Sequence, residues 1–134
     1  MAAPKSTESP STSNFNKRRT GKAGEDCAVR FLKRKGYRII ERNYRCVFGE
    51  VDIIAIDQGT VAFIEVKSRT SDRFGNPEEA VGKRKQKKIS QIAMNYLMVK
   101  DMVDCDARFD VVAVHLSVEG ERTELIKNAF DLLS

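Results

Sequence analysis

Histidine is scarce in this sequence: among 134 residues there is one, His115. A single histidine excludes any metal site that needs two or more imidazole ligands. Cysteine is nearly as scarce, and the three residues are widely spaced and odd in number. They fit neither a zinc site nor a disulfide framework, so we expect reduced thiols and a cytoplasmic protein.

Long hydrophobic runs are also missing. No apolar stretch approaches the roughly 18 residues of a membrane-spanning helix, and residues 1–19 lack the apolar region of a secretory signal. The residues that are present, 41% hydrophobic and 32% charged, are typical of a globular protein about one domain long. The sequence therefore predicts no membrane association.

The order of elements predicts an α/β fold. Residues 1–19 are rich in serine, threonine, proline and asparagine, so we expect a flexible basic tail before a single domain at 20–134. Hydrophobic spacing and turn signals then predict an αβββαβ order and a mixed central sheet flanked by helices. The expected helices are 21–35 and one ending near residue 99, and the expected strands are 37–44, 51–56, 61–67, 109–116 and an optional short strand at 124–126.

Positive charge is segregated along the chain. Residues 1–100 carry 21 Lys and Arg against 11 Asp and Glu, whereas residues 101–134 carry 3 against 8. The densest run has five cations in six positions, which are Lys83, Arg84, Lys85, Gln86, Lys87 and Lys88. A solvated helix face is one interpretation, although like charges at this spacing destabilise a helix. A polyanion such as DNA is the alternative partner.

Two acidic residues face each other across a predicted hairpin. Residues 57–60 form the turn signal, and loops of either two or four residues give the same register. Ile54 then lies opposite Phe63, and Asp52 lies opposite Glu65. Opposed like charges are destabilising, and burial beside apolar side chains would remove their hydration. A divalent cation such as Mg²⁺ or Mn²⁺ would resolve the conflict, because carboxylates are its preferred protein ligands.

Lys67 follows two residues after Glu65 on the same strand face. It could orient or deprotonate a water, or stabilise charge on a phosphate oxygen. The alternative is an ordinary ion cluster at the end of the sheet, in which Lys67 pairs with Glu65 or with Glu50 opposite it. Glu25 lies on or beside the inward stripe of the first helix, so it is either a further metal ligand or a glutamate favoured by the helix dipole.

Three segments carry a combined sequence pattern, which are Gly21-Lys22-Ala23-Gly24-Glu25, Gly49-Glu50-Val51-Asp52-Ile53-Ile54-Ala55 and Phe63-Ile64-Glu65-Val66-Lys67-Ser68-Arg69. Together they resemble the PD-(D/E)XK nucleases, which have a restriction-endonuclease-like core. The overall pattern is most similar to the YraN-like family and, through it, to Holliday-junction resolvases. Segments 108–112 and 128–130 also match that family, and the proline that names the superfamily motif is Val51 here.

This resemblance implies an αβββαβ core with a nuclease site. By the resemblance, Asp52 and Glu65 bind the catalytic metal, Lys67 assists the water, and Glu25 is the acid carried by the helix. The leading hypothesis is a Mg²⁺- or Mn²⁺-dependent endonuclease that acts on DNA, with branched or junction DNA as a candidate substrate. Arg69, Arg73 and the run from Lys83 to Lys88 would hold neighbouring phosphates.

Two other functions fit the same residues. A non-catalytic nucleic-acid-binding module would need the basic run but no metal. A protein-interaction domain would use the basic helix to meet an acidic partner. Symmetric cutting of a junction would require two active sites and hence a homodimer.

Overall fold

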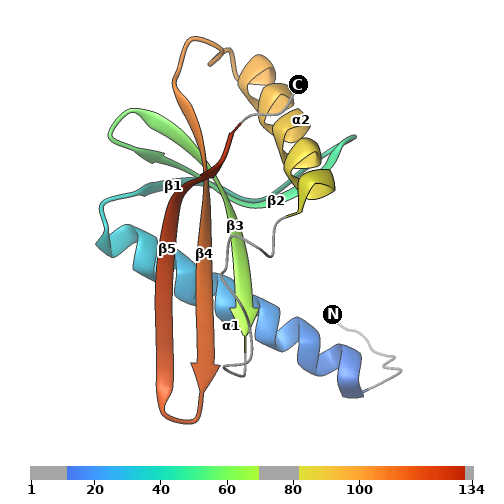
Figure 1. The fold of residues 1–134 in the computed structure, drawn as a ribbon, viewed down its shortest axis with the longest axis vertical. Coiled ribbons are helices and arrows are strands. Elements are labelled where there is room, and N and C mark those ends of the chain that lie inside the picture. Colours follow the sequence, from blue (N-terminus) through green and yellow to red (C-terminus); the bar gives the residue numbers. More distant parts are fainter. Residues whose placement is uncertain (1–11, 70–81, 132–134) are drawn as a thin grey trace, which may run out of the picture.

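The computed structural model describes residues 12–69 and 82–131, which form two helices and one five-stranded sheet (Figure 1). The strand order is β1-β2-β3-β4-β5, in which β3 and β4 are parallel and every other neighbouring pair is antiparallel. The predicted α/β class with a mixed sheet flanked by helices is confirmed. The elements are α1 (Thr12–Arg34), β1 (Arg38–Cys46), β2 (Gly49–Asp57), β3 (Thr60–Arg69), α2 (Lys83–Val99), β4 (Ala107–Ser117) and β5 (Gly120–Phe130).

Both faces of the sheet are covered, because β2, β3 and β4 alternate between two apolar surfaces. Ile54 and Phe63 pack with α2 in one buried cluster, and Ile53 and Ile64 pack with α1 in the other. Side chains that point to opposite sides of a strand thus meet different helices. Two-sided burial explains the near-continuous apolar runs of these strands.

The first helix is longer than the sequence predicts. Ala28 and Leu32 are fully buried at helical spacing, and the helix ends two residues before Gly36, whose φ is +96°. The expected start was Gly21, but α1 begins at Thr12, so residues 12–19 of the predicted tail are helical. No proline lies between residues 11 and 34, and the helix can therefore propagate towards the N-terminus. Residues 1–11 lie outside the described part of the chain.

The last strand is also longer than expected. A short strand at 124–126 was predicted, whereas β5 runs the length of β4 from Gly120 to Phe130. Much of β5 is exposed and charged, so its apolar alternation is weak and backbone pairing with β4 defines it. In the described residues neither helix has the length and hydropathy of a membrane span.

Candidate functional site

The predicted register of the β2–β3 hairpin is confirmed as far as Ile53. Ile56 pairs with Val61 and Ile54 pairs with Phe63, but the regular pairing of the two strands ends at Ile53 and Ile64. Beyond that point the backbone N–H of Val66 donates to Oδ2 of Asp52 at 2.8 Å. The carboxylate of Asp52 therefore takes an N–H that regular pairing would give to a backbone carbonyl.

Side-chain alternation in β2 breaks at Asp52. Ile53 packs in the cluster beneath α1, yet Val51 packs in the cluster beneath α2 with Ile54. In a regular strand, positions 51 and 53 would share a face. The expected ladder pair of Asp52 and Glu65 is thus corrected: their side chains interact at an irregular point of β2, where the regular pairing has ended.

The two carboxyl groups lie in an environment that disfavours two negative charges. Glu65 is buried, with 4% of its surface exposed, and Asp52 is half-buried beside it. Burial is the main cause that raises the pKa of Asp52 to about 7, and the charge of Glu65 adds to it. The N–H of Val66 acts in the opposite direction, because it favours the charged carboxylate.

Lys85 from the first turn of α2 provides the positive charge at this site. Its Nζ lies 2.5 Å from Oε2 of Glu65, and its side chain is 44% exposed against 5% for Glu65. Burial alone would lower the pKa of Lys85, but the hydrogen bond and the charge of Glu65 raise it above its ordinary value. Lys67 of β3 lies beside Lys85 and is half-buried. The sequence predicted Lys85 as a phosphate-binding residue and missed this contact.

Glu25 from α1 approaches Asp52 but has its own partners. Its carboxylate accepts hydrogen bonds from Nη2 of Arg42 at 2.9 Å and Nδ2 of Asn43 at 3.0 Å. Arg42 also pairs with Asp26 at 2.7 Å. The charge of Glu25 still helps to raise the pKa of Asp52. Within residues 12–69 and 82–131, no three His, Cys, Asp or Glu side chains are grouped as a metal site, so Glu25 is not brought into ligand distance with the acid pair.

The predicted phosphate-binding residues are only partly described. All five cations in the first turns of α2 are exposed, and Gln86 is half-buried among them. The backbone of Arg69 ends β3, while its side chain and the whole of Arg73 lie outside the described residues. Glu50 pairs with Arg45 at 3.5 Å. The exposed cations are Lys83, Arg84, Lys85, Lys87 and Lys88.

The donor set at the acid pair fits a hard divalent cation. Asp52 and Glu65 offer carboxylate oxygens from neighbouring strands, which suit Mg²⁺ or Mn²⁺ with waters in the remaining positions. The ammonium of Lys85 already marks a place where positive charge is favourable. Such a site could bind a cation next to a phosphate group that is bound by α2.

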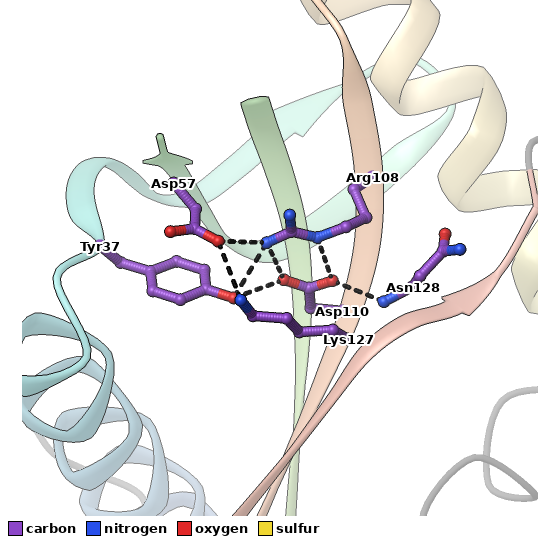
Figure 2. A network of polar contacts seen from close by, with 6 residues as sticks. All are labelled: Tyr37, Asp57, Arg108, Asp110, Lys127 and Asn128. Atoms are coloured by element: carbon purple, nitrogen blue, oxygen red, sulfur yellow. Dashed lines mark hydrogen bonds and ion pairs between the residues drawn. The ribbon is translucent and has the colours of Figure 1, made fainter. Parts of the chain in front are cut away.

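A second polar network lies at the other end of the hairpin, on the face covered by α1 (Figure 2). Asp110 has no exposed surface, and its carboxylate accepts hydrogen bonds from Tyr37 Oη, the Arg108 guanidinium and the Asn128 N–H, each at 2.9 Å. Arg108 also bonds Asp57 at 2.9 Å.

These polar groups satisfy one another, so the network joins β2, β4 and β5 to Tyr37, which directly precedes β1, rather than offering a free site. Arg108 and Asp110 are two residues apart and so share one strand face, which is the signal in the sequence that could have indicated this network.

The similarity of this chain to known proteins covers the residues of the candidate site. A family model described as "Uncharacterised protein family UPF0102" matches residues 24–114. A UPF0102 protein of Syntrophus aciditrophicus is 58% identical over 114 residues, 85% of this chain and 90% of the relative. One of Caldicellulosiruptor saccharolyticus is 47% identical over 118 residues, 87% of this chain and 100% of the relative. Among solved structures, Pyrococcus furiosus SfsA in complex with Ca²⁺ aligns with 83% of this chain at 18% identity and a TM-score of 0.40, and the chain spans 62% of its length.

Proposed function

This chain belongs to uncharacterised protein family UPF0102, the YraN family of PD-(D/E)XK-like proteins, and from that premise we propose that it is a metal-dependent DNA endonuclease. The observation that carries the proposal is the buried pair Asp52 and Glu65. Two adjacent acids at an irregular point of a buried strand are unfavourable for folding, and positive charge from Lys85 already offsets them. A fold alone has no need of this arrangement.

Each residue of the site would have a different role in phosphodiester hydrolysis. Asp52 and Glu65 would hold Mg²⁺ or Mn²⁺, which supplies Lewis-acid polarisation of the scissile phosphate and a more acidic water when bound. Lys67, half-buried two residues after Glu65, would orient the attacking water or stabilise negative charge on a phosphate oxygen. Glu25 would act through its charge on Asp52 and through bound water.

The first turns of α2 would hold the DNA backbone. Its first turn contains no acidic residue, and Lys83, Arg84, Lys87 and Lys88 are exposed. A basic helix start favours anions through both its side chains and the N–H groups of its first turn. Phosphates bound there would lie next to the acid pair, because Lys85 of the same turn contacts Glu65.

The test is cleavage of a supercoiled plasmid and of a four-way junction with Mn²⁺. We expect Asp52→Asn and Glu65→Gln each to lower the cleavage rate at least about 100-fold, since metal polarisation contributes several kcal/mol. Glu50→Gln is the matched control, because Glu50 lies on the same strand but is exposed and paired with Arg45. Undiminished cleavage by either acid variant would reject the assignment.

A non-catalytic nucleic-acid-binding module is the second candidate. It is favoured by one observation, the Lys85–Glu65 ion pair, because this pair supplies positive charge to the acids without a metal. In that case calorimetry would detect tight DNA binding by the wild-type chain but no uptake of Mn²⁺. Heat from Mn²⁺ binding that disappears in Asp52→Asn would favour the nuclease.

We also propose that the chain acts on DNA in the cytoplasm, where its three free cysteines would stay reduced. Junction DNA cut symmetrically on two strands would need two copies of the site. Light scattering of the chain with and without a four-way junction would report whether a homodimer forms.

A further inference from the structure

Lys85 belongs at once to the basic surface and to the acid pair. It lies in the first turn of α2, between exposed Arg84 and Lys87, yet its Nζ contacts Glu65 at 2.5 Å. Its side chain remains 44% exposed, so the ammonium is within reach of solvent and of a bound anion. Among the described residues of α2, Lys85 is the cation that forms an ion pair with Glu65, so it links the basic surface directly to the acid pair.

Separating this ion pair costs Glu65 more free energy than it costs Lys85. Glu65 is buried, so without Lys85 its charge would face that of Asp52 with one neighbouring cation fewer. Lys85 is half-exposed and flexible, so it can exchange a carboxylate for a phosphate at little loss. The pair therefore holds only while no other cation reaches Glu65 and no other anion reaches Lys85.

We propose that Lys85 is a switching counter-ion that couples DNA binding to metal loading. This inference rests on the proposed function and deepens it. In the free protein the ammonium occupies the position at Glu65 that a divalent cation would take. A DNA phosphate on α2 draws the ammonium away and frees the carboxylate, so each ligand strengthens the binding of the other. Such coupling is reciprocal by thermodynamic linkage.

The first arm of the test uses the metal alone. Mn²⁺ is titrated into the full chain by calorimetry at pH 8 without DNA. We expect Lys85→Gln to bind Mn²⁺ about tenfold more tightly than the wild type, because a positive charge has been removed from the ligand set. Lys85→Arg keeps the charge and should bind like the wild type. Lys87→Gln, which removes a neighbouring cation of the same helix, should leave the Mn²⁺ affinity unchanged.

The second arm measures the coupling itself. Fluorescence anisotropy gives the affinity of a labelled 20-base-pair duplex with and without Ca²⁺, an oxygen-liganded ion used here as the divalent probe. We expect Ca²⁺ to tighten DNA binding about fivefold or more in the wild type and to a similar extent in Lys87→Gln. In Lys85→Gln most of this enhancement should disappear.

The outcomes separate the two proposals. Equal Mn²⁺ affinities of the wild type and Lys85→Gln would overturn the switch while leaving the nuclease intact. Absence of Mn²⁺ uptake by both proteins would instead overturn the metal-dependent function on which the switch rests. Circular dichroism of each variant checks that α2 and the sheet are retained.

Discussion

Asp52 is the residue at which the folding of this chain and its proposed chemistry conflict. Burial is the main cause that raises the pKa of its carboxyl group to about 7, and the charges of Glu65 and Glu25 add to it. The ordinary value is 3.8, so between these two values the folded protein holds a proton that the unfolded chain has released. Folding is therefore weakened as pH rises through this window.

We predict that the metal-free protein loses stability between about pH 4 and pH 7, the interval between the two pKa values of Asp52. The Asp52→Asn variant has no carboxylate to charge, so its free energy of unfolding should exceed that of the wild type by about 1–2 kcal/mol at pH 8 and match it near pH 4. Urea unfolding with a chelator present measures both. Glu50→Gln should follow the wild-type profile. A constant difference between wild type and Asp52→Asn across pH would contradict the expected titration.

The contact between Lys85 and Glu65 could not be predicted from the sequence. Asp52 and Glu65 could be placed together because a short hairpin fixes their register. The partner of Glu65 depends on how α2 returns across the sheet, which no local pattern encodes. The break of alternation at Asp52 was equally hidden, since a strand is assumed regular until its backbone is seen.

At the scale of elements, the fit of α1 against β3 positions Glu25. A Cβ added to Gly24 would lie 1.8 Å from Oγ and 3.0 Å from Cβ of Ser68, so helix and strand touch at this glycine. Glu25 is the next residue, and its charge reaches Asp52. A side chain at position 24 would push α1 away from the sheet at the edge of the candidate site.

We predict that Gly24→Ala lowers the free energy of unfolding by about 1–2 kcal/mol, because overpacking outweighs the gain of nearly 1 kcal/mol in helix propensity. Gly21→Ala is the control. Gly21 lies on the same helix, and among the described residues no atom comes within 4 Å of the added Cβ. This variant should be stabilised by up to about 1 kcal/mol. Thermal unfolding of both variants tests the prediction. Stabilisation by both substitutions would show that a Cβ at position 24 is not overpacked against Ser68.

The elements with strong apolar periodicity were those the sequence predicted well. The helix over 83–99 and the strands with Ile54, Phe63 and Val112 were recognisable from their buried residues. The first turns of α1 and most of β5 were missed, because their residues are polar and gain their structure from continuing a helix or pairing with a neighbour.

At the scale of the whole molecule, charge is distributed unevenly. The first 100 residues have an excess of cations and the remainder an excess of acids, while the net charge is +5. The exposed cations of α2 gather at one end of one helix, whereas the acids of β5 lie at an edge of the sheet. Such polarity would orient the protein on a polyanion as it approaches.

We predict DNA binding with a steep dependence on salt. If about five phosphates are neutralised, log K should fall with log salt at a slope near −4.5. Replacing Lys87 and Lys88 together by Gln should reduce the slope by about 1.8, since two contacts are lost. Lys33→Gln, an exposed cation at the end of α1, should leave the slope unchanged. Anisotropy between 50 and 200 mM KCl measures the slopes, and binding indifferent to salt would contradict the prediction.

The open sheet has one further consequence. In the described residues β1 and β5 each pair on one side only, which leaves a row of backbone groups on both outer strands. Irregular pairing occurs along both, near Ile39 of β1 and between Ile126 and Phe130 of β5. Both strands also carry exposed charges, such as Arg42 and Glu124. A foreign strand arriving there would meet a kinked template and unfavourable charges, which protects the chain from edge-to-edge aggregation.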